Sequence, residues 1–135
     1  MIVVDTNLIA YAVVPGDRTD AALSVLEVDS DWVAPALWRS ELRNALATTM
    51  RAGKLSLAGA ADAFERADRL VTDADLQDAT EACLRLAADG RTSAYDAEFV
   101  FVAERLGKPL VSADRKLAKA FPGRILSPEE FVARG

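Results

Sequence analysis

The chain has 135 residues, of which 51% are hydrophobic and 27% are charged, and this balance fits a globular domain rather than a disordered segment. It contains no histidine, which excludes a Ser/His/Asp triad, a Cys/His pair and any histidine-ligated metal, so that acid–base chemistry is left to carboxylates, lysine, tyrosine or metal-bound water. The net charge of −5 argues against loose nucleic-acid binding through a generally basic surface.

The apolar runs in the sequence are short. None of them approaches the roughly 20 residues that a membrane span needs. The N-terminus lacks a basic stretch followed by an apolar signal core, and we therefore expect a cytoplasmic protein. The single cysteine, Cys83, lies in a helical pattern and is expected to be a buried thiol.

Strand-like and helix-like segments alternate along the chain, and this order predicts an α/β fold. We expect a small parallel sheet of four or five strands with helices on both faces, in a single domain that spans residues 1–135. In chain order, hydrophobic periodicity and capping residues predict strand 2–4, a helix capped by Thr6 or Asn7, a helix capped by Thr19, strand 32–34, helix 36–51, a helix capped by Ser56, a weak edge strand at 71–72, helix 76–88, a helix from Ser93 to Leu106, strand 110–112, a short helix opening at Asp114, strand 124–126 and a last helix capped by Ser127.

The first strand carries an acid to its carboxyl end. Three β-favouring apolar residues at 2–4 indicate a strand buried on both faces, and Asp5 follows directly. In open α/β sheets, ligands bind outside the carboxyl ends of the strands. Asp5 taken alone is explained as simply by a turn or helix-cap role.

Further acids stand at comparable places. Asp114 follows a second strand, and Glu41 lies near the start of helix 36–51, beside the buried stripe yet able to reach a cleft. Because the carboxyl ends of parallel strands share one edge, we expect Asp5, Asp114 and Glu41 to converge there. Asp96 follows a loop between two helices, so this rule does not fix its position.

Convergence of carboxylates has an electrostatic cost. Two of them 4 Å apart repel by roughly 4 kcal/mol at an effective dielectric constant of 20. Several in one pocket require a cation or raised pKa values, and hard oxygen ligands suit Mg²⁺ or Mn²⁺. An Mg²⁺ ion with open water positions can bind phosphate and supply a nucleophilic water, which is the chemistry of phosphodiester hydrolysis. The alternative is that each acid is only a cap, and Asp96 already has such a role behind Ser93.

Five fragments in this order resemble a known family. They are Val3 to Asn7; Pro35 to Leu37 with Glu41, Asn44 and Leu46; Ser93 with Tyr95, Asp96 and Ala97; Leu110 to Ser112 with Asp114 and Leu117; and Ser127 to Phe131. In these fragments the chain resembles the PIN-domain ribonucleases, most closely the VapC-type toxins of bacterial toxin–antitoxin pairs. The resemblance covers nearly the whole chain.

The resemblance implies a metal-dependent endoribonuclease that leaves a 5′-phosphate and a 3′-hydroxyl. In it, Asp5, Glu41, Asp96 and Asp114 match the acidic quartet that holds one or two Mg²⁺ or Mn²⁺ ions, with Glu41 binding directly or through water. The supporting polar positions beside the site are assigned to Thr6, Asn7, Asn44 and Ser112. The implied partners are an RNA substrate, a second copy of the chain, and an antitoxin protein whose tail enters the active-site groove.

Basic residues near the expected edge are candidate contacts for RNA phosphates. They are Arg39, Arg43, Arg115 and Lys116, although ordinary surface charge explains at least half of them. Glu98 is either an additional acid behind Asp96 or part of a solvated helix face.

Other functions remain as alternatives. A haloacid-dehalogenase-like phosphatase needs a second aspartate two residues after the first, where this chain has Asn7. A phospho-acceptor receiver domain needs a pair of adjacent acids early in the chain, and only Asp5 is present there. A PIN-fold module that binds RNA or protein without cutting, and a purely structural dimer, are the non-enzymatic alternatives.

Overall fold

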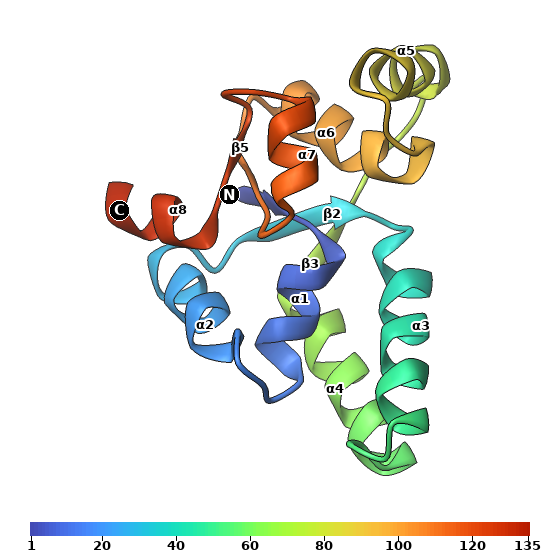
Figure 1. Cartoon of the computed structure of the whole chain (residues 1–135), viewed down its shortest axis with the longest axis vertical. Coiled ribbons are helices and arrows are strands. Elements are labelled where there is room, and N and C mark those ends of the chain that lie inside the picture. The colour runs from blue at the N-terminus through green and yellow to red at the C-terminus, as the bar shows by residue number, and fades with distance from the viewer.

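The computed structural model describes residues 1–135, which form strands and helices in alternation (Figure 1). None of the helices has the length and apolar character needed to cross a bilayer. The elements are β1 (Ile2–Val4), α1 (Thr6–Val13), α2 (Thr19–Val28), β2 (Trp32–Pro35), α3 (Trp38–Arg51), α4 (Leu57–Leu70), β3 (Val71–Ala74), α5 (Thr80–Gly90), α6 (Ala94–Leu106), β4 (Leu110–Val111), α7 (Arg115–Ala120), β5 (Ile125–Leu126) and α8 (Pro128–Arg134).

The five strands form one parallel sheet in the order β3-β2-β1-β4-β5. β1 is central, with Val3 opposite Val33 of β2 on one side and opposite Leu110 of β4 on the other. Parallel neighbours need crossover connections, which the helices between them supply. The predicted α/β fold is confirmed, and the weak strand signal at 71–72 is part of the edge strand β3.

Helices cover both faces of the sheet. Figure 1 shows α5, α6 and α7 on one side of the strands and α1 to α4 on the other. α6 packs on β1 and β2 through its buried residues 97 and 99–103, and α5 packs on α6. The core contains 31 buried apolar residues, of which Trp32 and Trp38 are the largest. The three residues of β1 are buried, as expected for a central strand.

Two helices begin later than the sequence pattern predicts. The helix expected at 76–88 begins only at Thr80, because Asp78 adopts a φ of 58°, which a right-handed helix does not allow. The helix expected from residue 36 begins at Trp38. Cys83 is buried in α5 as predicted.

Two predicted caps are also wrong. Asp5, and not Thr6 or Asn7, caps α1 with its own carboxylate. Arg18 stands at the N-cap of α2, while the Thr19 hydroxyl donates to the carbonyl oxygen of Val14 and accepts from the amide of Gly16. The Thr19 side chain therefore stabilises the preceding turn rather than the helix.

Candidate active site

Asp5 lies at the centre of the carboxyl edge of the sheet, directly after β1. Its Oδ1 accepts a hydrogen bond from the amide of Leu8 at 2.9 Å, and its Oδ2 accepts one from the hydroxyl of Ser112, which follows β4. Only 8% of Asp5 is exposed. The carboxylate is thus both a helix cap and a buried acid held between two adjacent strands.

Burial raises the pKa of Asp5 to about 6. The hydrogen bonds from Ser112 and from the Leu8 amide act in the opposite direction, while the negative charges of Asp114 and Asp96 raise the pKa further. Because these charges act on Asp5, the three carboxylates belong to one electrostatic cluster, although they come from distant parts of the sequence.

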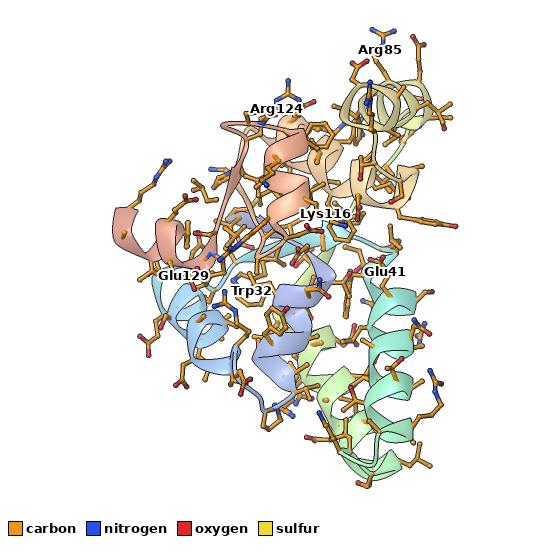
Figure 2. All side chains as sticks on the ribbon, viewed as in Figure 1. Trp32, Glu41, Arg85, Lys116, Arg124 and Glu129 are labelled. Atoms are coloured by element: carbon orange, nitrogen blue, oxygen red, sulfur yellow. The ribbon has the colours of Figure 1, made fainter.

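Glu41 lies in the first turn of α3, and Figure 2 shows it at the end of that helix nearest the sheet. The hydroxyl of Thr6 donates to Oε1 of Glu41 at 2.7 Å. Thr6 itself is buried beside Asp5. A polar residue next to Asp5 therefore fixes the position of the glutamate.

Asp96 and Asp114 complete the acidic set. In the first turn of α6, Asp96 accepts at Oδ2 from the hydroxyl of Thr92 at 3.0 Å. Asp114 caps α7, and its Oδ1 accepts from the amides of Lys116 and Leu117. The Ser112 hydroxyl that donates to Asp5 also accepts from the Asp114 amide at 3.0 Å. Ser112 therefore links two of the four acids.

The four carboxylates line one small pocket of about 70 Å³, together with Thr6, Asn7, Phe99 and Leu117. A wider groove of about 480 Å³ adjoins it, because Thr6, Asn7 and Glu41 also line that groove. No basic side chain lines either space, and none of the four acids forms an ion pair. The negative charge of the pocket is therefore not neutralised by the protein.

This donor set fits a hard divalent cation. Carboxylate oxygens with no histidine or thiolate among them are typical ligands of Mg²⁺ and Mn²⁺. With the side chains as they stand, however, no three acidic residues are close enough to enclose an ion. Binding would therefore require the carboxylates to draw together. Glu41, Asp96 and Asp114 each keep one oxygen without a hydrogen-bond partner for this purpose.

The four basic candidates fall into two groups. Arg39 forms ion pairs with Asp68 and Asp73, and Arg43 lies over the ring of Phe64. Arg115 and Lys116 are exposed on α7, where Figure 2 labels Lys116. None of the four lines the acidic pocket or the adjoining groove.

Glu98 is half-buried in a separate pocket that also contains Cys83. Burial, followed by the charge of Glu41, raises the pKa of Glu98. Thr92 and Ser40 are missing from the predicted set of site residues. Thr92 lies four residues before Asp96, a spacing that points to it only once the loop conformation is known.

The family model of the PIN domain matches residues 2–121 of the chain. The chain belongs to the PIN domain family. PIN domains are typically nucleases that use divalent metal ions, which supports hydrolase activity at this general level. Membership removes the phosphatase and receiver-domain alternatives.

A solved structure supports the same fold for this PIN domain. The chain is similar to the crystal structure of PAE2754 from Pyrobaculum aerophilum, with a TM-score of 0.78 and 22% sequence identity, over 98% of this chain and 94% of that chain. At this identity the similarity shows the fold alone. No significant match was found among curated proteins.

Proposed function

We propose that this PIN domain is a metal-dependent endoribonuclease whose catalytic and metal-binding residues are Asp5, Glu41, Asp96 and Asp114. The observation that carries the proposal is that acids from separate elements line one small pocket that contains no basic side chain. Such an excess of negative charge is stable in a fold when a cation offsets it. The proposed cofactor is Mg²⁺ or Mn²⁺, and the proposed substrate is an RNA phosphodiester bond.

Each acid has a task in the proposed reaction. Asp5, Asp96 and Asp114 would hold the metal ion, which when bound supplies Lewis-acid chemistry and offsets negative charge on the transferring phosphoryl group. Glu41 is held in place by the hydroxyl of Thr6. Its carboxylate would accept a hydrogen bond from the attacking water molecule and so orient the water oxygen toward phosphorus. The new P–O bond forms as the bond to the 3′-oxygen breaks. The attacking water releases one proton to bulk solvent and the leaving 3′-oxygen takes one up from bulk solvent, giving a 5′-phosphate and a 3′-hydroxyl.

The hydrogen bonds around Asp5 support this assignment. The Leu8 amide and the Ser112 hydroxyl both favour the ionised carboxylate, which is the form that binds a cation. Arg115 and Lys116 are the proposed phosphate contacts, because both are exposed directly after Asp114, whereas Arg39 is paired with Asp68 and Asp73.

Incubation of purified protein with a mixture of structured RNAs tests the proposal. We expect cutting in Mg²⁺ or Mn²⁺ that EDTA abolishes and that Asp5→Asn abolishes without loss of the fold. End analysis of the fragments should find 5′-phosphates. A correctly folded Asp5→Asn protein with full activity would overturn the assignment of the site.

One observation favours a second candidate, a PIN-fold module that binds RNA or protein without cutting. No three acids are arranged around a common metal position in this structure. Calorimetric titration with Mn²⁺ separates the two functions when read beside the cleavage assay. A nuclease binds the ion and cuts, whereas the module shows neither ion binding nor cutting.

We further propose that the nuclease is the toxin of a type II toxin–antitoxin pair, on the basis of its resemblance to VapC-type toxins. In that role it would form a homodimer and be inhibited by an antitoxin. Induced expression of the chain alone should arrest bacterial growth, and Asp5→Asn should not. Light scattering of the purified protein measures the dimer. Unimpaired growth at a verified level of folded, active nuclease would contradict the toxin role.

A further inference from the structure

The groove beside the acidic pocket has an exposed tyrosine at its rim. Tyr95 lies in the first turn of α6, immediately before Asp96, and 64% of it is exposed. Every other aromatic residue of the chain is buried or half-buried. The ring of Tyr95 is therefore not part of the core, and a ligand in the groove can reach it.

Three other polar side chains of the groove also lack a hydrogen-bond partner. Asn7, Ser40 and Asn44 are exposed, and their side chains, like the hydroxyl of Tyr95, form no hydrogen bond within the protein. The ring of Tyr95 is not stacked on another aromatic ring, since the only stacked pair is Trp38 with Phe64. The groove therefore offers one free ring face and several free amide and hydroxyl groups.

We propose that this groove is the binding subsite for the unpaired nucleobase next to the bond that is cut, an inference that rests on the proposed nuclease function. The base stacks on Tyr95, while the amides of Asn7 and Asn44 bind its edge. A volume of about 480 Å³ falls within the range of small-ligand sites and accommodates one nucleotide. A base engaged in this way has left its helix, so the substrate is single-stranded at that point.

The lining favours a base over a phosphate. No basic side chain reaches the groove, and the acids beside it repel a second phosphate. Stacking on an aromatic ring needs no positive charge, because every base has a π-face. The amide groups of asparagine carry both a donor and an acceptor and can read a base edge in two contacts.

Fluorescence anisotropy with a short labelled single-stranded RNA tests the subsite. All proteins carry Asp5→Asn, so that the RNA stays intact in Mg²⁺. Tyr95→Ala should raise the Kd by about 5- to 150-fold, which corresponds to the measured range for loss of one stacked base. Tyr95→Phe keeps the ring and should bind within about twofold of the parent. Leu57→Ala, at an exposed apolar residue of α4, is the surface control.

Two results would overturn the subsite. One is that Tyr95→Ala binds the RNA as tightly as the parent, and the other is that a fully paired duplex binds as tightly as the single strand. If Tyr95→Ala converts a dimer to a monomer in light scattering and leaves RNA binding unchanged, the ring covers a second copy instead. Cleavage by the chain with Asp5 intact is scored separately. If RNA binding depends on Tyr95 but the chain does not cut RNA, the nuclease proposal fails and the subsite stands. If the chain cuts RNA but binding does not depend on Tyr95, the subsite fails and the nuclease proposal stands.

Discussion

Asp5 is a buried acid, and burial together with the nearby carboxylates disfavours its ionised form. Its folded-state pKa of about 6 lies above the ordinary value of 3.8. The fold therefore holds a proton on Asp5 more tightly than the unfolded chain does, and this group makes stability fall as the pH rises from about 4 to about 6. Above about pH 6 the destabilisation is complete, and it amounts to about 3 kcal/mol at most.

Asp5→Asn should accordingly stabilise the metal-free protein at neutral pH. The amide keeps the shape of the carboxyl group and an oxygen for the Leu8 amide, but it removes the buried charge. We expect a free energy of unfolding at pH 7.5 that is about 1–3 kcal/mol higher than that of the parent, with the difference gone near pH 4. Urea denaturation in EDTA measures it. Asp17→Asn, at an exposed carboxylate without an ion pair, should change little, and a variant of Asp5 less stable than the parent at pH 7.5 contradicts the prediction.

Ser112 joins two acids through one hydroxyl. Ser112→Ala removes the donor to Asp5 and the acceptor of the Asp114 amide, and the loss should lower the free energy of unfolding by about 1–3 kcal/mol. Because the lost hydrogen bond favoured the ionised form, the pKa of Asp5 should rise further. The acidic limb of the pH–rate profile for RNA cleavage should therefore move to higher pH.

The control for this change is Ser24→Ala, whose hydroxyl makes only an exposed bond within α2. It should leave both the free energy of unfolding and the pH profile unchanged. An acidic limb at the same pH in Ser112→Ala and in the parent would show that Ser112 does not act on the ionisation of Asp5.

Strand and helix positions in the sequence predict three of the four pocket acids, and only the family resemblance includes the fourth, Asp96. Asp96 follows a loop between helices, and it reaches the pocket only because α6 packs across β1 and β2. The cap interpretation of Asp5 is confirmed, and it does not exclude the proposed site role, because Oδ1 caps α1 while Oδ2 accepts from Ser112. The guanidinium of Arg39 is paired with Asp73, which lies 34 residues away in the chain, so no local sequence pattern predicts the pair.

At the scale of the elements, the misplaced start of α5 shows where periodicity fails. Leu76 and Ala79 continue the apolar spacing of the helix and both pack on the core, yet they lie in the preceding turn. The left-handed conformation of Asp78 separates them from α5. An apolar pattern records which residues are buried and does not record the backbone dihedral angle between them.

The C-terminal end of α5 approaches α7 through a glycine. A Cβ atom at Gly90 would lie 2.4 Å from Cζ of Phe121, and that ring is buried. Gly90→Ala should therefore lower the free energy of unfolding by about 1–3 kcal/mol, even though alanine favours a helix by about 1 kcal/mol. Urea denaturation measures the change.

Gly16→Ala is the matched control for Gly90. A Cβ atom there meets no atom within 4 Å, and this glycine has no positive φ. The control should be neutral or slightly stabilising, because alanine reduces the freedom of the unfolded chain. If Gly90→Ala is as stable as Gly16→Ala, the contact between α5 and Phe121 is loose, and Gly90 is not required for close packing there.

At the scale of the whole molecule, parallel topology is what gathers distant acids. Each strand delivers its carboxyl end to the same edge, so residues as far apart as Asp5 and Ser112, 107 positions in sequence, share a hydrogen bond. The alternation of strands and helices predicts this edge without any knowledge of the strand order. The order itself, with β1 in the centre, depends on pairings between distant segments that no local pattern contains.

A divalent ion should stabilise the whole fold through this edge, because a ligand that binds only the folded state adds its binding free energy to stability. At an ion concentration of 100 times Kd the gain is about 2.7 kcal/mol, which corresponds to a rise in Tm of about 5–10 °C for a chain of this size. Thermal scans with Mn²⁺ at pH 7.5 should show this rise, and EDTA should reverse it. The shift should shrink below about pH 6, where Asp5 binds a proton in competition with the ion. Asp114→Asn should weaken the response while Asp17→Asn keeps it. An equal rise in both variants would place the ion elsewhere on this acidic protein and would remove the metal from the proposed site.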